Sequence, residues 1–266
     1  MNKIHIGKIA ERILVRTAWT AVLLTLFLTP RVVHAQNSFK VASSDGPKTG
    51  ATVETAQNCK IIFLGFVGAL EPAGNKYSGV VQIRKTLQGK EYTDVCANSF
   101  SPYVWTEGRD WLLKHFPSHD GPLTPEELQR SPKVILIGHS MGGWAMMSVA
   151  RELRSRDIPV ELTIQMDSVG ITDYTIPKNV KSCAIFHAND MLMFMTTKHV
   201  KREDPNYTNV VADVMVAGAG HQSITRDPRI RELVMATVES LRTSIASHAL
   251  PVLAHPTAAT HTSDRQ

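Results

Sequence analysis

The run VILIGHSMGG, residues 134–143, constrains the fold of this chain more than any other segment. Four apolar residues lead directly into Gly138, and a stretch with helical spacing follows the run. We therefore expect a strand, a tight turn and a helix, with Ser140 at the apex of the turn. Gly138 and Gly142 lie two residues to either side of Ser140, where larger side chains would collide with the strand and the helix.

Such a turn exposes a serine hydroxyl at the carboxyl end of a strand. The N-terminus of the following helix offers N–H groups and the positive end of a dipole to an oxyanion. These residues resemble the nucleophile elbow of the α/β-hydrolases, and the resemblance implies that Ser140 is a nucleophile. The competing interpretation is an ordinary glycine-rich strand-to-helix turn with a serine cap.

Further strands and helices are expected around the elbow. Predicted strands cover residues 60–67, 92–98, 160–166, 182–186 and 210–216, and predicted helices cover 78–87, 105–116, 143–156 and a segment that begins at Pro228. Apolar strands that alternate with helices predict the α/β class, with a mostly parallel central sheet and helices on both faces. The resemblance places the strands as the third to eighth of the α/β-hydrolase sheet. Only residues 168–182 separate two of them, so we expect no large cap domain.

A nucleophilic serine needs a base and an acid that orients the base. In the family that this chain resembles, the order along the chain is serine, acid, histidine. His221 directly follows the last predicted strand, at the family's position for the base. Asp167 ends the strand after the elbow, and Asp190 follows the next strand, where most members of the family keep the acid. We favour Asp167 and retain Asp190 as the alternative.

The oxyanion hole is expected to combine the N–H of Met141 with a second N–H from the loop after the first strand. There the frequent His-Gly pair of the family is replaced by Gly65-Phe66, so Phe66 or Val67 is the expected second donor. The side chain of His139 should point away from that of Ser140, and we expect it to pack rather than to act as a base.

Charge argues against a nucleic-acid partner. The chain has 266 residues and a net charge of +5, but residues 1–35 hold five basic residues and one acidic residue. The remainder holds 24 basic and 23 acidic residues, which predicts no basic patch.

The N-terminal segment has the pattern of an export signal. A basic stretch precedes the mostly apolar residues 18–29, and Val33-His-Ala35 has the small-residue form of a cleavage site. We expect a periplasmic or secreted protein that is cleaved near Ala35. The alternative is a membrane anchor formed by residues 18–29. The predicted domains are a signal peptide (1–35), a flexible lead-in (36–58), the α/β-hydrolase domain (59–248) and a disordered tail (249–266).

The three cysteines are expected to be small buried hydrophobic residues. A bridge between Cys59 and Cys96 is awkward, because the predicted strands place the two residues at different heights. No cluster of His, Cys and Asp shows ligand spacing, so no metal or organic cofactor is expected.

Together these patterns predict an exported serine hydrolase that cleaves carboxylic esters, like an esterase or a lipase. The expected partner is a small-molecule or lipid ester. The segment Met191–Met195 suggests an apolar flap that contacts acyl chains or, transiently, a membrane or lipid surface; an ordinary buried or amphipathic turn is the simpler interpretation. The alternatives are a thioesterase or acyltransferase, and a non-catalytic or lipid-surface binding protein with the same fold.

Overall fold

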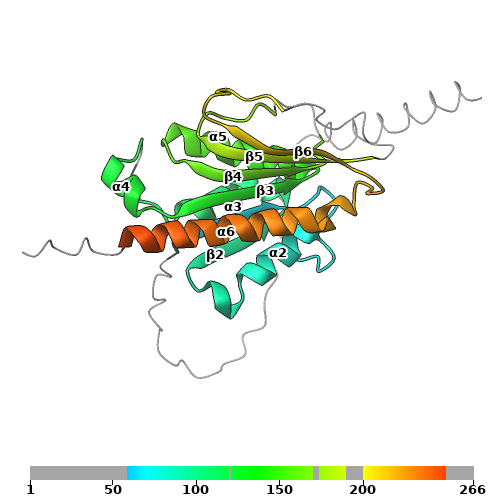
Figure 1. Cartoon of the computed structure of the whole chain (residues 1–266), viewed down its shortest axis with the longest axis horizontal. Coiled ribbons are helices and arrows are strands. Elements are labelled where there is room, and N and C mark those ends of the chain that lie inside the picture. The colour runs from blue at the N-terminus through cyan, green and yellow to red at the C-terminus, as the bar shows by residue number, and fades with distance from the viewer. Residues whose placement is uncertain (1–58, 120, 170–173, 190–199, 250–266) are drawn as a thin grey trace, which may run out of the picture. The chain divides into compact units, whose positions relative to one another are not determined.

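Six parallel strands form the central sheet (Figure 1). This computed structural model describes residues 59–119, 121–169, 174–189 and 200–249. The strands lie in the order β2-β1-β3-β4-β5-β6. Their bounds are Ile61–Phe66 (β1), Val95–Phe100 (β2), Lys133–His139 (β3), Val160–Met166 (β4), Val180–Ala188 (β5) and Asn209–Val216 (β6). The predicted parallel sheet is confirmed.

Helices cover both faces of this sheet, as predicted. The helices are α2 (Gly79–Leu87), α3 (Trp105–Leu113), α4 (Pro125–Arg130), α5 (Met141–Ser155) and α6 (Pro228–Ala249), with short turns η1 (Lys90–Tyr92), η2 (Pro102–Val104) and η3 (Ile224–Arg226). Ile61 and Phe63 of β1 pack in a core with α2 and α6, whereas Ile62 and Leu64 pack in a second core with α3 and α5. Successive side chains of a strand point to opposite faces, so one fully buried strand contributes to both cores.

The connection between β4 and β5 is short. Residues 167–179 are the whole connection between these strands. This length confirms that no large cap domain is inserted there. Several predictions fall outside the described residues: the export signal, the lead-in, the segment Met191–Met195 and the tail beyond Ala249.

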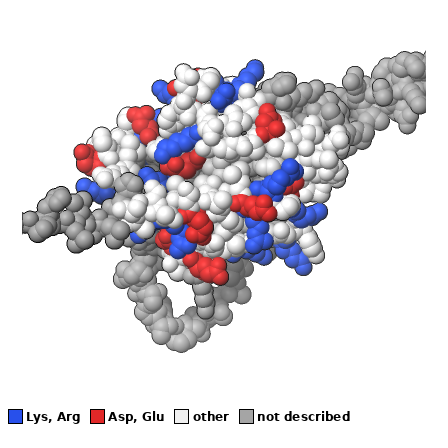
Figure 2. Space-filling view, viewed as in Figure 1, with Lys and Arg blue, Asp and Glu red and all other residues white. Residues whose placement is uncertain are grey.

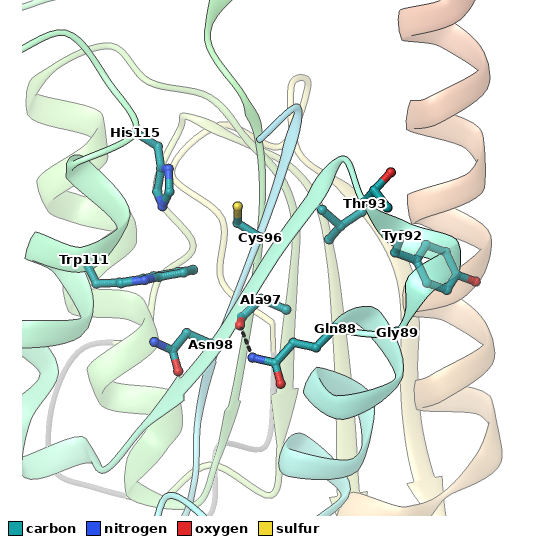
Figure 3. Close-up of a pocket in the computed structure, with 10 residues that line it drawn as sticks. Gln88, Gly89, Tyr92, Thr93, Cys96, Ala97, Asn98, Trp111 and His115 are labelled. Atoms are coloured by element: carbon teal, nitrogen blue, oxygen red, sulfur yellow. Dashed lines mark hydrogen bonds between the residues drawn. The ribbon is translucent and has the colours of Figure 1, made fainter. Parts of the chain in front are cut away.

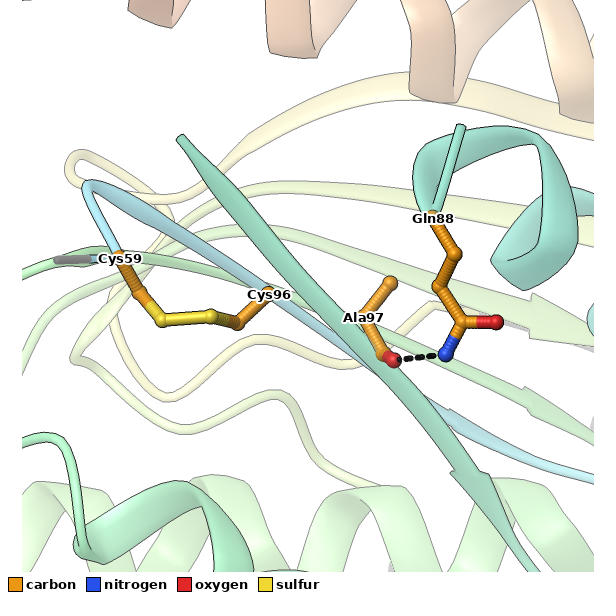
Figure 4. The surroundings of a disulfide bond; sticks show 4 residues. All are labelled: Cys59, Gln88, Cys96 and Ala97. Atoms are coloured by element: carbon orange, nitrogen blue, oxygen red, sulfur yellow. Dashed lines mark hydrogen bonds between the residues drawn. A yellow bond between two sulfur atoms is a disulfide. The ribbon is translucent and has the colours of Figure 1, made fainter. Parts of the chain in front are cut away.

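Cys59 and Cys96 form a disulfide bond, so the expectation that both are separate buried thiols was wrong (Figure 4). Their Cα atoms lie 5.5 Å apart. The physical reason is the true start of β2 at Val95, which places Cys96 opposite Ile62 near the start of β1. Cys59 precedes β1, so the alternation of side chains along a strand does not fix the direction of its side chain.

Cys183 is the free cysteine of the described residues, and it is buried in β5 as expected. Burial raises the pKa of its thiol to about 11, so the thiol stays protonated at neutral pH.

On the face drawn in Figure 2, acidic and basic side chains are interspersed, and no large patch of a single charge is visible. Among the described helices, none combines the length and the apolar character that crossing a membrane requires.

Candidate active site

The turn between β3 and α5 holds Ser140 in a backbone conformation that few residues other than glycine adopt. Its φ is 54° and its ψ is −125°. A Cβ atom on Gly138 would lie 2.3 Å from the carbonyl oxygen of Gly142, so the turn cannot close this tightly with a side chain there. Ser140 therefore lies at a sharp strand-to-helix turn, as the glycine spacing predicted.

Asp167 and His221 meet beside this turn. The Nδ1 atom of His221 lies 2.5 Å from the Oδ2 atom of Asp167. The Asp167 side chain is fully buried, and its Oδ1 atom accepts a hydrogen bond of 3.1 Å from the N–H of Ala188. A buried carboxylate with one oxygen fixed by the main chain and the other on an imidazole can hold that ring in one orientation. The alternative acid, Asp190, lies outside the described residues.

Main-chain hydrogen bonds tie the elbow to the end of β4. The Ser140 N–H donates to the Met166 carbonyl at 3.0 Å, and the Val169 N–H donates to the Ser140 carbonyl at 3.3 Å. The backbone of Ser140 is therefore bonded to residues that lie just before and just after Asp167 in the sequence.

The order of these parts along the chain decides the type of fold. Ser140 follows β3 of a parallel sheet, Asp167 follows β4, and His221 follows β6. The serine lies on a strained turn that leads into the helix α5. The chain has the α/β-hydrolase fold.

Several solved structures match this chain, although their sequences are distant. Est1E from Butyrivibrio proteoclasticus is 14% identical, with 70% of this chain and 90% of that chain covered at a TM-score of 0.41. A dienelactone hydrolase from Anabaena variabilis is 11% identical, with 68% and 87% covered at a TM-score of 0.42. The mouse alpha/beta hydrolase domain-containing protein 10 is 12% identical, with 69% and 90% covered at a TM-score of 0.41. No family model and no curated protein matches the sequence.

The loop after β1 lies directly against the elbow. A Cβ atom on Gly142 would lie 2.4 Å from the Phe66 carbonyl oxygen, and one on Gly68 would lie 3.6 Å from the Cβ atom of Ser140. Phe66 is the last residue of β1. The N–H of Val67 donates to the Phe100 carbonyl at 3.1 Å, because the ladder with β2 continues one residue beyond the strand. The sequence suggested Val67 as a possible donor to an oxyanion, but its N–H is already bonded to Phe100 in this structure.

His139 is fully buried and contacts both sides of the site. Its Nε2 atom lies 2.8 Å from the backbone carbonyl oxygen of His221, and the two rings lie 4.8 Å apart between centroids. Its Nδ1 atom lies 3.5 Å from an Oε2 atom of Glu71. His139 therefore packs in the interior, as expected, and also makes polar contacts through both ring nitrogens.

Glu71 is a residue that the sequence did not indicate as part of the site. Its Oε2 atom accepts the N–H of Gly68 at 3.2 Å, and its Oε1 atom accepts a side-chain N–H of Asn75 at 3.1 Å. Burial by itself would raise the pKa of Glu71, but the hydrogen bonds, that with His139 first among them, hold the pKa below its ordinary value. No sequence motif marks this position, since the contact depends on how the loop folds back.

Another histidine that follows the elbow, His187, contacts a different acid. Its Nε2 atom lies 2.9 Å from the Oδ1 atom of Asp213 on β6. His199 also follows the elbow in the sequence and lies outside the described residues. Among the described histidines that follow the elbow, His221 is thus the one whose ring contacts the carboxylate at the end of β4.

A hollow of 510 Å³ lies at the edge strand β2, away from the elbow (Figure 3). Its lining includes Cys96, Trp111 and His115 but none of Ser140, Asp167 and His221. The ligand atoms of Cys59, Cys96 and His115 lie within 4.8 Å of one another, a metal-like grouping that the sequence spacing did not indicate. The two sulfur atoms are bonded to each other in this structure and so cannot act as thiolate ligands.

Proposed function

We propose that this protein is a serine hydrolase that cleaves carboxylic esters through an acyl-enzyme on Ser140. The observation that carries the proposal is the 2.5 Å contact between His221 Nδ1 and the buried Asp167 carboxylate, at the end of the strand that fixes the Ser140 backbone. This arrangement suits an imidazole whose Nε2 atom accepts a proton while its Nδ1–H stays on the ring and donates a hydrogen bond to the carboxylate.

The reaction follows from these roles. The Ser140 oxygen attacks the ester carbonyl carbon, and His221 takes the hydroxyl proton. The tetrahedral intermediate collapses as the alcohol leaves with that proton, so Ser140 carries the acyl group. Water then attacks the acyl-enzyme with His221 as the base, and the acid is released. Asp167 keeps its charge throughout and stabilises the imidazolium that forms.

The oxyanion is stabilised by the N–H of Met141 and a second N–H from the loop after β1. Met141 is the first residue of α5, where N–H groups have no partner within the helix. In the loop, the N–H of Val67 is bonded to Phe100 and that of Gly68 to Glu71, so Ala69 is the next donor along the chain. Each such donor contributes about 3 kcal/mol at the transition state.

Labelling with a fluorophosphonate tests this function. The purified protein is expected to react covalently, with the adduct mapped to Ser140 by mass spectrometry. Labelling should be lost in Ser140→Ala and in His221→Ala, whereas Ser148→Ala, a change on the same helix α5, should label as the natural protein does. If the folded natural protein does not react, the non-catalytic binding protein becomes the better interpretation.

The ester class is tested separately from the nucleophile. p-Nitrophenyl acetate, acetyl-CoA and an alcohol acceptor distinguish an esterase, a thioesterase and an acyltransferase. Fast release of p-nitrophenol with slow cleavage of the thioester is the outcome that supports the ester assignment.

We also propose that the chain is exported after cleavage near Ala35. The disulfide between Cys59 and Cys96 supports export, because such bonds persist in oxidising compartments. N-terminal sequencing of the protein from the producing cells should begin near Gln36. An intact N-terminus in the membrane fraction would instead favour an anchor formed by residues 18–29.

A further inference from the structure

We propose that Glu71 and His139 are positioning residues that hold the loop after β1 (residues 67–78) and the loop after β6 (residues 217–223) in place beside Ser140. This inference rests on the proposed function, since it assigns both residues a role in that reaction. They would act through main-chain groups and not by contact with the substrate.

The Glu71 side chain fixes the loop after β1. One carboxylate oxygen accepts a hydrogen bond from the N–H of Gly68, and the other accepts one from the side-chain amide of Asn75. The side chain thus ties the start of the loop to its middle. Gly68 lies against the elbow, because a Cβ atom there would come 3.0 Å from the His139 ring. The peptide that follows Gly68 carries the N–H of Ala69, whose direction therefore depends on this bond.

The His139 ring fixes the loop after β6. A backbone carbonyl can only accept a hydrogen bond, so the His139 Nε2 atom must carry the proton that it directs at the His221 carbonyl. The main chain of His221 is thereby fixed at 2.8 Å from a fully buried ring on the residue next to the nucleophile. Asp167 orients the His221 ring, and His139 places the backbone from which that ring extends.

The contact between Glu71 and His139 joins these two supports. The Oε2 atom that accepts the Gly68 N–H also lies 3.5 Å from the His139 Nδ1 atom. One partly buried carboxylate thus contacts the loop after β1 and the His139 ring, which in turn contacts the main chain of His221. Catalytic groups that shift by about 1 Å can lose 100-fold in rate, which sets the scale of the expected effect.

Four variants and one control test the proposal. Glu71→Leu removes both interactions at similar volume. Glu71→Gln can keep an oxygen on the Gly68 N–H while it removes the carboxylate charge beside the His139 ring. His139→Leu and His139→Gln make the same comparison at the second residue. Glu127→Ala, which removes the capping box of α4, is a purely structural control.

The readouts are the second-order rate of fluorophosphonate labelling at Ser140, the split between kcat and KM for p-nitrophenyl acetate, and the Tm. All rates are measured at a temperature at which circular dichroism shows that every variant is folded. We expect both leucine variants to label at least tenfold more slowly, with kcat lowered more than KM is changed. Both glutamine variants should stay within about threefold of the natural protein, and Glu127→Ala should lower Tm without slowing the labelling.

Labelling by folded Glu71→Leu at the natural rate would overturn the proposal. So would a loss in Glu71→Gln equal to that in Glu71→Leu, because the hydrogen-bonding geometry would then not be the property that matters. If the leucine variants do not fold, a slow Glu71→Gln that has the natural Tm overturns it as well. If the natural protein itself does not label, the proposed function fails and this inference falls with it.

Discussion

The Nδ1 atom of His221 lies 2.5 Å from the Oδ2 atom of Asp167, although the two residues are 54 positions apart in the sequence. Asp167 ends β4 and His221 follows β6, so the parallel sheet brings both to its carboxyl edge. The choice between two candidate acids, which the sequence left open, thereby acquires a geometric argument for Asp167.

Replacing Asp167 by asparagine should lower kcat about 10⁴-fold, because the amide would favour the wrong tautomer of His221. The asparagine oxygen can still accept the Ala188 N–H, so the Tm should change little. Steady-state kinetics on p-nitrophenyl acetate measures the loss, with Asp190→Asn as the matched control. A large loss in Asp190→Asn and none in Asp167→Asn would assign the acid to Asp190.

Gly138→Ala should lower the free energy of unfolding by about 1–3 kcal/mol or prevent folding. The new Cβ atom would lie 2.3 Å from a main-chain oxygen, which cannot rotate away as a side chain could. Urea denaturation measures the effect. The control is Gly74→Ala, where a Cβ atom would meet nothing within 4 Å; equal stability of the two variants would contradict the tight turn.

Loss of the disulfide in the double variant Cys59→Ser, Cys96→Ser should destabilise the protein by about 4 kcal/mol, the value that chain entropy gives for cysteines 37 positions apart. Thermal unfolding of the double variant beside the natural protein measures it. Addition of a reductant should lower the Tm of the natural protein and leave that of the double variant unchanged. Equal Tm values for the two proteins without reductant would show that the bond does not form.

Cys183 should not react with Ellman's reagent in the folded protein at pH 8, because burial raises the pKa of its thiol to about 11. One thiol should appear when the protein unfolds without a reductant, and three after reduction. The thiol ionises more readily in the unfolded chain, where its ordinary pKa is 9.0, so the stability that this group contributes should decline as the pH rises above 9. Rapid reaction of the native protein would contradict the burial.

The elbow could be predicted from the sequence because its geometry requires specific residues. The main-chain atoms around Gly138 leave no room for a side chain, so the local sequence records the local structure. The same holds for β4, whose predicted bounds agree with the observed Val160–Met166. Where the backbone restricts the choice of residue, a single sequence is informative.

The second strand was harder to predict because its first residues are not in the sheet. The predicted strand began at Tyr92, but Lys90–Tyr92 form a 3₁₀ turn and β2 begins at Val95. This shift concealed the disulfide. The helix α4 was also missed, although the capping box of Thr124 and Glu127 is a sequence signal for its start.

Glu71 could not be identified from sequence, because nothing periodic relates it to the elbow. Its carboxylate reaches His139 only after the loop beyond β1 has folded back over the strand end. A contact of this kind depends on tertiary structure, which single-sequence patterns do not encode.

The disulfide between Cys59 and Cys96 makes a covalent ring of the chain segment that contains β1, the loop after β1 and α2. The most exposed apolar side chain of that loop, Leu70, is 86% exposed. A protease that cuts the main chain beside Leu70 therefore releases no fragment, because the two new ends stay joined through the sulfur atoms. Nicked and intact molecules would have nearly the same mass until the bond is reduced, so cleavage of this loop is visible only on a reducing gel.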